Sequence, residues 1–376
     1  MTNLPLVDLM GQYKKIEQEI DHAVLDVIKS GAYINGPEVK AFAEDLQNYL
    51  DVKHVIPCAN GTDALQIAMM ALGLKPGDEV ITPSFTYIAT AEVIALLGLK
   101  AVFVDVNIDT YNIDPSEVRK AITDKTKAIV PVHLYGQCAE MEELLAISKE
   151  FNIPLVEDTA QAIGSDYTFS NGKVQKAGTI GAVGTTSFFP SKNLGCFGDG
   201  GAMFTNDDEL ASKLRMIANH GQSKRYYHDL IGCNSRLDSI QAAILRIKLR
   251  HLDAYSEARR KAAHHYSSEF QKIEGILPPY EASYSSHGYH QYTMRLHGID
   301  RTALQDYLTE HGIPSNIYYP VPVHKQKGFE GKFEQVGTLP NTMQLTEEVL
   351  SLPMHTEMDD KTLNYITNSI KEFVEA

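Results

Sequence analysis

The sequence is poor in cysteine, and the few cysteines that it has lie far apart. Its 376 residues contain four, with no CxxC pair and no spacing typical of metal ligands. They are Cys58, Cys138, Cys196 and Cys233. Zinc modules and disulfide-stapled domains are therefore not indicated, and we expect reduced thiols and no bound metal.

Long apolar runs and an excess of positive charge are missing as well. No run approaches the roughly 20 residues of a membrane-spanning helix, and Asp8 interrupts the first apolar stretch, so no secretory signal is indicated. The sequence has 34 Lys and Arg residues and 48 Asp and Glu residues. The resulting net charge of -14 repels nucleic acid and anionic membranes. We expect a globular, cytoplasmic protein that binds neither and holds any anionic ligand in a local site.

Common nucleotide-binding loops and DNA-binding signals are also absent. No GxGxxG or GxxxxGKS/T motif follows a predicted strand, and no helix-turn-helix pattern occurs. The chain has no internal repeat, no low-complexity segment and no Pro/Ser-rich linker. A bound dinucleotide, a P-loop nucleotide and DNA binding are therefore not indicated.

The sequence does contain a regular alternation of short apolar strands and helical patterns. Strands are expected at residues 54–58, 79–83, 101–105, 128–133, 154–158, 184–189 and 201–205, and helices at 64–72, 86–97, 115–122 and 140–151. Strands separated by helices predict an α/β fold with a mostly parallel sheet that helices cover on both faces.

Helical patterns flank this region on both sides. Residues 11–50 are expected to be helical with interruptions at Gly31 and Gly36, and residues 238–270 form a long helical run that leads to a second domain. This run is expected to carry Arg250, Arg259 and Arg260 on exposed faces. The rest of the chain mixes strand and helix patterns. We therefore expect a large domain at residues 1–240 and a smaller α+β domain at residues 241–376.

One lysine lies in an unusual apolar turn. Residues 187–195 (SFFPSKNLG) set it between aromatic residues, a proline and a glycine, just before a glycine-rich run. We expect this turn to end a strand and to direct Lys192 into a site where apolar walls help it to lose its proton. Lys192 is therefore a candidate Schiff-base lysine. The alternative is an ordinary surface lysine.

Two other stretches offer contacts for an anionic aromatic ligand. Gly61 and Thr62 open a helix, where backbone N–H groups bind phosphate, or they form a plain N-cap. Asp158 ends a strand at the edge where ligands gather, or it caps the next helix. With Lys192 these are the contacts that pyridoxal phosphate needs: a phosphate seat, an amine for its aldehyde and a carboxylate that keeps its ring nitrogen protonated.

Five ordered motifs resemble the nucleotide-sugar aminotransferases, the DegT/StrS group of fold type I pyridoxal-phosphate enzymes, over essentially the whole chain. They are residues 60–65 (NGTDAL), 86–90 (TYIAT), 157–161 (EDTAQ), 187–195 (SFFPSKNLG) and 232–238 (GCNSRLD). The resemblance implies that Tyr87 stacks on the cofactor ring, that Gln161 reaches the ring face near its phenolic oxygen and that Asp158 pairs with the ring nitrogen. It also implies that Ser187 contacts the phosphate. Asn234 would reach the phosphate of the partner subunit in a homodimer with shared active sites.

The resemblance also implies a reaction. L-glutamate donates an amino group to the cofactor, and a keto sugar attached to a nucleotide then accepts it, in a ping-pong transamination. Lys192, once freed, would carry the proton between the substrate carbon and the cofactor. Lys192 also separates this chain from the family's sugar dehydratases, which carry histidine there. Cys233 and Phe189 depart from the tyrosine and histidine that are common in the family, and both changes would reshape the pocket without touching the catalytic set.

The C-terminal segment 317–326 (IYYPVPVHKQ) resembles that of members acting at C3 of the sugar, particularly those that aminate a UDP-linked 3-oxo derivative of N-acetylglucosaminuronic acid. Tyr318, Tyr319 and His324 are therefore candidate substrate contacts. Arg236 suits such a substrate, because its planar fork holds a carboxylate in two hydrogen bonds. The alternatives are a structural Arg236, tyrosines that belong to the core, a 4-oxo sugar substrate, and a noncatalytic relative that only binds ligand.

Overall fold

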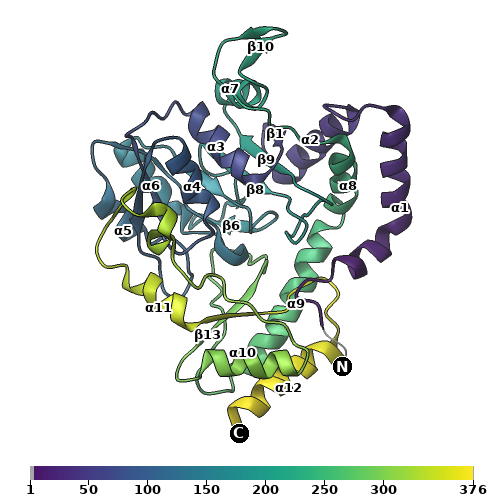
Figure 1. The fold of residues 1–376 in the computed structure, drawn as a ribbon, viewed down its shortest axis with the longest axis vertical. Helices are drawn as coiled ribbons and strands as arrows, with labels where there is room; N and C mark the ends of the chain where they lie inside the picture. Colours follow the sequence, from purple (N-terminus) through teal and green to yellow (C-terminus); the bar gives the residue numbers. More distant parts are fainter. Residues whose placement is uncertain (1–3, 376) are drawn as a thin grey trace.

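The structure is a computed structural model that describes residues 4–375 (Figure 1). Residues 1–3 and 376, which the domain prediction includes, lie outside the described part. A large sheet forms from two four-stranded sheets, whose strands in spatial order are β1 (His54–Cys58), β9 (Gly201–Thr205), β8 (Val183–Ser187), β5 (Val156–Asp158), then β4 (Thr126–Ile129), β2 (Glu79–Pro83), β3 (Lys100–Val104) and β14 (Phe333–Gln335). Parallel bridges from Ile129 to Leu155 and from Val132 to Asp158 join them.

The sheet is mostly parallel, as the sequence predicts. β5 pairs with β8, β2 with β4 and with β3, and β14 with β3, all in parallel. The exception is β9, which runs antiparallel to β8 and β1. The chain reverses between β8 and β9 in a closed loop, where Phe188 N donates to Gly200 O (2.7 Å) and Cys196 N donates to Phe188 O (2.8 Å). The predicted lysine turn lies in this loop.

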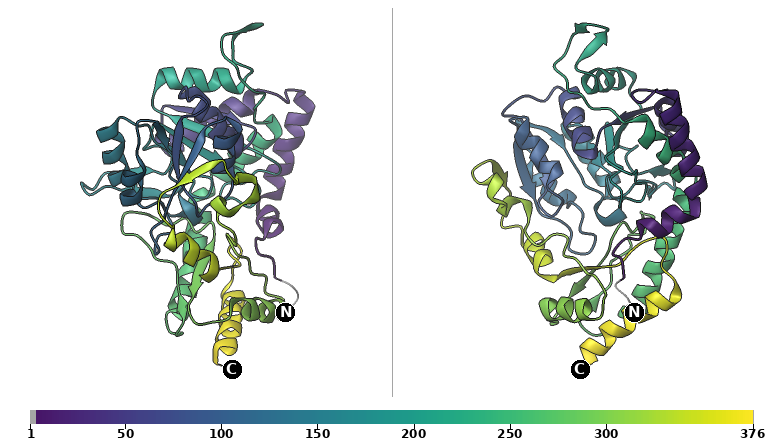
Figure 2. Two further views of the ribbon diagram at one scale, coloured as in Figure 1. Left: turned by 60° about the vertical axis from the view of Figure 1, so that its left-hand side comes forward. Right: turned by 45° about the vertical axis from the view of Figure 1, so that its right-hand side comes forward.

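Helices cover both faces of the sheet, which confirms the predicted α/β fold (Figure 2). Ala101 and Phe103 of β3 pack in one cluster with one set of helices, and Val102 and Val104 pack in another cluster with a second set. This alternation is what a strand buried on both faces requires. The first set comprises α3 (Gly61–Ala71), α4 (Ala89–Leu96) and α7 (Asp208–Ala218), and the second comprises α5 (Pro115–Ala121) and α6 (Met141–Phe151).

The predicted helical region at the start of the chain is split in two. α1 (Leu9–Ser30) ends at Gly31, which has a left-handed φ of 68°, and α2 (Pro37–Leu50) begins at a proline. The predicted run 238–270 is likewise split into α8 (Ser239–Leu249) and α9 (Leu252–Phe270). α9 descends from the large sheet toward the C-terminal part of the molecule (Figure 1).

One arginine of this run differs from the prediction. Arg259 is not on an exposed face; it is 3% exposed, and its guanidinium donates to the carbonyl oxygens of Tyr289 (3.1 Å) and Met354 (3.0 Å). The reason is that Arg259 shares its side of α9 with the buried Ala262, Ala263 and Tyr266, whose helical spacing places them toward the core. The prediction for Arg259 was therefore wrong.

The C-terminal residues build a smaller antiparallel sheet with its own apolar cluster. Its strands are β12 (Ile276–Leu277), β13 (Tyr292–Leu296) and β15 (Val349–Leu352), accompanied by α10 (Arg301–Glu310), α11 (Pro340–Glu348) and α12 (Asp360–Glu375). From this part, β14 returns to the edge of the large sheet beside β3. The proposed domain boundary between residues 240 and 241 stays a prediction.

Short elements complete the described chain. They are the hairpins β6 (Asp166–Thr168) with β7 (Val174–Lys176) and β10 (Gln222–Lys224) with β11 (Tyr227–His228), and the single turns η1 (Leu134–Gly136), η2 (Val323–Lys325) and η3 (Lys327–Phe329). The β10–β11 hairpin projects away from the body of the molecule (Figure 1). Within residues 4–375, none of the helices combines the length and the apolar composition that crossing a bilayer requires.

Candidate active site

A cavity of about 530 Å³ opens where β5 and β8 end and α3 begins. Nine of the predicted site residues line it: Gly61, Thr62, Tyr87, Asp158, Gln161, Ser187, Lys192, Tyr318 and Tyr319. These residues come from five segments that are far apart in the sequence, and the fold brings them together at one edge of the mostly parallel sheet. Their individual roles stay predictions at this point.

Lys192 lies in the loop between β8 and β9, and its backbone N–H donates to Phe189 O (2.8 Å). Two hydrogen bonds to other segments hold the loop in place: Asn193 Nδ2 donates to Gly288 O (2.7 Å), and the Lys248 ammonium donates to Gly195 O. Burial lowers the pKa of Lys192 to about 8, and the nearby Asp158 carboxylate partly opposes this shift. A neutral amine is therefore accessible at Lys192 close to neutral pH.

Asp158 ends β5 and is 6% exposed. One carboxylate oxygen accepts from Thr90 Oγ1 (2.8 Å), and the other accepts from Ala160 N (3.1 Å). The second contact is the turn cap that the sequence left as an alternative. Each carboxylate oxygen has two lone pairs, so this cap leaves acceptor capacity for a ligand in the cavity.

The start of α3 is shaped for close approach to β8. Asn60 is the N-cap, because its side chain accepts from Asp63 N (2.8 Å). Gly61 and Thr62 therefore form the first turn, where backbone N–H groups precede the first helical hydrogen bond. A Cβ on Gly61 would lie 2.7 Å from Ser187 Cβ, so only glycine fits between the helix start and the end of β8.

Gln161 connects two tyrosines around the cavity. Tyr135 N donates to Gln161 Oε1 (2.7 Å), which fixes the amide so that Gln161 Nε2 donates to Tyr319 OH (3.0 Å). Tyr319 lies 6.1 Å from Tyr87 between ring centroids, and burial raises the pKa of the Tyr319 phenol above its ordinary value. Tyr319 thus remains a neutral hydroxyl whose proton is free to point into the cavity.

The cavity is also lined by polar residues that are not among the predicted site residues, including Thr86, Asp199, His290 and Gln291. Within the described chain, Thr86 Oγ1 and His290 Nδ1 are buried without a hydrogen-bond partner. Burial, aided by the charges of Lys192 and Arg259, lowers the pKa of His290 well below its ordinary value. Thr86 belongs to the motif at residues 86–90, so the sequence could have indicated it. His290 lies in a plain strand pattern without a motif, so nothing in the sequence indicated a place in the site.

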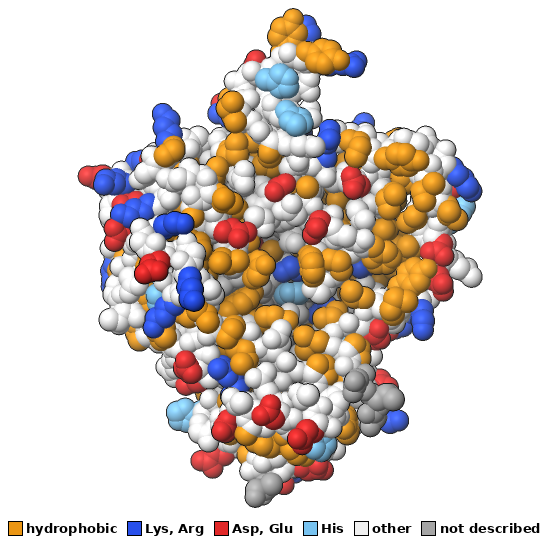
Figure 3. Space-filling view, viewed as in Figure 1, with side chains coloured by type: hydrophobic (Ala, Val, Ile, Leu, Met, Phe, Trp, Pro, Cys, Tyr) orange, Lys and Arg blue, Asp and Glu red, His pale blue; other side chains and the backbone are white. Residues whose placement is uncertain are grey.

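Three predicted residues do not line the cavity. Asn234 is exposed and Arg236 is half-buried, both in the loop that follows the β10–β11 hairpin. The tip of this projecting hairpin shows hydrophobic and basic side chains (Figure 3). His324 is buried, and its Nδ1 lies 2.7 Å from Ser84 Oγ.

The residues present fit pyridoxal phosphate. Buried polar groups normally have partners, so the unpaired Thr86 Oγ1 in the cavity wall points to a polar ligand. The first turn of α3 suits a phosphate, the Lys192 amine suits an aldehyde, and Asp158 suits a protonated ring nitrogen. A dinucleotide or a P-loop nucleotide would not require these three contacts together.

The sequence pattern of the DegT/DnrJ/EryC1/StrS aminotransferase family matches residues 14–371. A pleiotropic regulatory protein of Geobacillus stearothermophilus is 46% identical over 373 residues, which cover 99% of this chain and 98% of that protein. A UDP-2-acetamido-2-deoxy-3-oxo-D-glucuronate aminotransferase of Pseudomonas aeruginosa is 45% identical over 363 residues, 96% of this chain and 98% of that enzyme. The crystal structure of DesV from S. venezuelae superposes with a TM-score of 0.95 at 39% identity and covers 100% of both chains.

Proposed function

Because the chain belongs to the DegT/DnrJ/EryC1/StrS aminotransferase family, we propose that it transfers the amino group of L-glutamate to a 3-oxo nucleotide-linked sugar. The enzyme is a nucleotide-sugar aminotransferase that uses pyridoxal 5'-phosphate. The proposed acceptor is UDP-2-acetamido-2-deoxy-3-oxo-glucuronate, and the product is the 3-amino sugar for surface polysaccharide synthesis. The name of the P. aeruginosa relative supports this acceptor, since the match covers 98% of that enzyme.

The observation that carries the proposal is the meeting of Lys192 and Asp158 in one cavity with the first turn of α3. When bound, pyridoxal phosphate supplies a ring that accepts the electrons left on a carbon as it loses a proton. Asp158 would hold the proton on the ring nitrogen, and Lys192 would take a proton from one carbon and return it to another. The lowered pKa of Lys192, about 8, suits a base that works near neutral pH.

Gly61, Thr62 and Ser187 would hold the phosphate, Tyr87 would stack on the ring, and Gln161 would reach the ring face near its phenolic oxygen. Tyr318 and Tyr319 line the same cavity and would contact the sugar. The His324 side chain reaches Ser84 and not the cavity, and His324 N also donates to Ser84 Oγ (3.2 Å). We therefore propose that His324 supports the sugar contacts by fixing segment 317–326 in place.

The acceptor can be tested with a panel of UDP- and dTDP-linked 3-oxo and 4-oxo sugars, each with L-glutamate as donor. We expect the UDP-linked 3-oxo uronate to give the highest kcat/KM, because Arg236 adds a charge-assisted contact to its carboxylate. The matched control is the same UDP sugar without the C6 carboxylate, which should lose about tenfold or more. Faster turnover of a 4-oxo sugar would contradict the proposed acceptor while leaving the enzyme an aminotransferase.

The working unit is proposed to be a homodimer with shared sites. In this arrangement Asn234 and Arg236 of one subunit complete the cavity of the other, which accounts for their position outside their own cavity. The adjacent hairpin and the residues just after it expose large apolar side chains, since Tyr226, Tyr227 and Ile231 are 77%, 60% and 86% exposed. Exposed apolar side chains gathered on one projection are typical of an interaction surface.

Mixing two inactive variants tests the shared site. Lys192→Ala and Arg236→Ala chains should each have little activity, and their mixture should recover part of it. In a hybrid dimer one site combines the intact Lys192 of one chain with the intact Arg236 of the other. Activity of the mixture is measured with subunit exchange confirmed by native mass spectrometry. A mixture that exchanges and stays inactive would show that Arg236 serves its own subunit or a structural role.

A further inference from the structure

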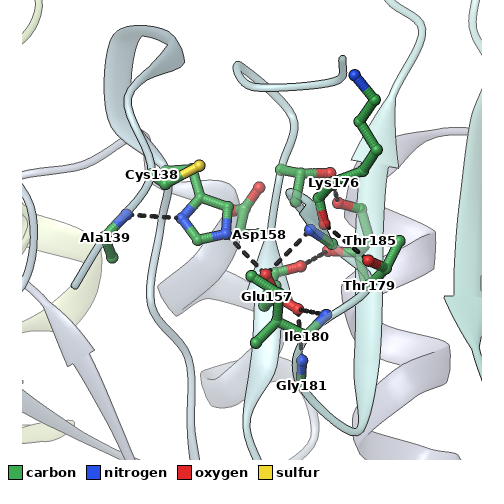
Figure 4. Close-up of polar contacts among 12 residues, drawn as sticks. Cys138, Ala139, Glu157, Asp158, Lys176, Thr179, Ile180, Gly181 and Thr185 are labelled. Atoms are coloured by element: carbon green, nitrogen blue, oxygen red, sulfur yellow. Dashed lines mark hydrogen bonds and ion pairs between the residues drawn. The ribbon is translucent and has the colours of Figure 1, made fainter. Parts of the chain in front are cut away.

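A second carboxylate lies directly behind Asp158. Successive residues of a strand point to opposite sides, so the Glu157 side chain faces away from the cavity that Asp158 lines. The Glu157 side chain is 0% exposed, as is that of His133 beside it. Glu157 accepts four hydrogen bonds: from His133 Nε2 (2.9 Å), Gly178 N (2.9 Å), Ile180 N (2.8 Å) and Gly181 N (2.6 Å) (Figure 4).

The donor pattern requires a carboxylate at this position. Ala139 N donates to His133 Nδ1 (3.0 Å), so the ring proton of the neutral histidine lies on Nε2 and is donated to Glu157. All four partners of Glu157 are therefore donors, two on each oxygen. A glutamine in its place would direct its own N–H groups against two of these donors.

The four donors belong to segments that end in the cavity wall. His133 follows Val132, which lines the cavity, and His133 N donates to Asp158 O (3.0 Å). The loop 178–181 leads into β8, whose Thr185 lines the cavity and accepts from Thr159 N (2.8 Å). Through its hydrogen bonds, Glu157 therefore holds the segment at His133 and the loop 178–181 against β5, the strand that carries Asp158.

Stability alone is a poor explanation for this arrangement. Burying a carboxylate is costly, and apolar side chains of similar volume often stabilise a core at least as well. Several short hydrogen bonds to one rigid group instead fix the relative positions of the segments that donate them. The strands that Glu157 joins are those that carry Asp158 and lead to Lys192.

We propose that Glu157, held by His133, is a positioning residue that fixes the Asp158 carboxylate relative to Lys192. The role concerns the cofactor side of the site and applies to both half-reactions. It does not depend on which sugar the enzyme accepts.

The test uses Glu157→Gln and the milder His133→Asn, which removes one of the four donors. In folded, cofactor-loaded enzyme, the single-turnover rate with saturating L-glutamate should fall by about 10- to 100-fold for Glu157→Gln, the effect typical of a misplaced catalytic group. The glutamate concentration for half-maximal rate should stay the same. The apoenzyme should also bind the cofactor more weakly, which is measured by titration without any turnover.

A matched control is available at Asp105, another buried carboxylate. Asp105 accepts from Asn341 N (2.9 Å), Thr342 N (2.8 Å) and Thr342 Oγ1 (2.7 Å), and it does not line the cavity. Asp105→Asn should lower the thermal unfolding temperature without changing the rate per cofactor-loaded site.

A double variant separates positioning from a merely structural role. If Glu157 acts through Asp158, adding Glu157→Gln to Asp158→Asn should cause little further loss of rate, because the group being positioned is already gone. The proposal would be overturned if the rate losses of Glu157→Gln and Asp158→Asn multiplied in the double variant. It would also be overturned if Glu157→Gln and His133→Asn each kept the normal rate and the normal cofactor affinity. If Glu157→Gln does not fold, His133→Asn alone and in the Asp158→Asn background decides in the same way.

Discussion

Lys192→Ala should abolish transamination and remove the near-visible absorbance of the cofactor-loaded enzyme, while the cofactor should still bind through its phosphate. This is the largest loss that we expect from a single substitution. The variant would lack both the amine proposed to hold the cofactor and the base proposed to move the proton. Covalent attachment and proton transfer thus fail together. Absorbance after gel filtration and a glutamate-dependent assay measure the two losses separately.

Lys248 provides a matched control for this experiment. It is also a buried lysine, burial lowers its pKa to about 8 as well, and it contacts the same loop through Gly195 O. It does not line the cavity. Lys248→Met should therefore keep the absorbance, even though it removes a support of the loop. Loss of the band in this variant, with the band retained in Lys192→Ala, would mean that the covalent lysine is misassigned.

Asp158→Asn should slow the glutamate half-reaction by several powers of ten. An amide does not hold a proton on the ring nitrogen, so the ring accepts electrons poorly and the barrier to proton removal rises. Each tenfold loss corresponds to about 1.4 kcal/mol of barrier, so a thousandfold loss requires about 4 kcal/mol. The rate is followed by stopped-flow absorbance on cofactor-loaded protein.

Near-normal turnover in Asp158→Asn would reduce Asp158 to the turn cap that it also forms with Ala160 N. Asp105→Asn serves as the control for exchanging a buried carboxylate for an amide. It should leave the half-reaction rate unchanged. A similar loss in both variants would indicate general destabilisation and not a role for Asp158 at the ring nitrogen.

Local patterns predicted most of the fold and the centre of the site. The alternation of apolar strands and helices predicted the sheet, and strand ends and helix starts located Asp158, Gly61 and Thr62. The three residues line one cavity because the carboxyl ends of parallel strands meet at one edge, and their roles stay predictions. The antiparallel β9 was not anticipated, because its reversal depends on backbone contacts within the loop at Phe188 and Cys196.

Features that depend on distant contacts could not be predicted. Arg259 is a charged residue in a helical run, which predicts an exposed position, but its guanidinium donates to carbonyl groups of two remote segments. His290 enters the cavity wall because its backbone N–H donates to Tyr135 O (2.8 Å), a contact across 155 positions. The hydrogen bond between His133 and Glu157 is hidden for the same reason: nothing local pairs a loop histidine with a strand carboxylate.

Borohydride reduction tests the central claim most directly. It fixes the cofactor permanently on the lysine that holds it, and peptide mass mapping then identifies that lysine. The account predicts a single modified peptide that contains residues 187–195, with the added mass on Lys192. A label on Lys248 or on any other lysine, with Lys192 unmodified, would contradict the assignment of the active site.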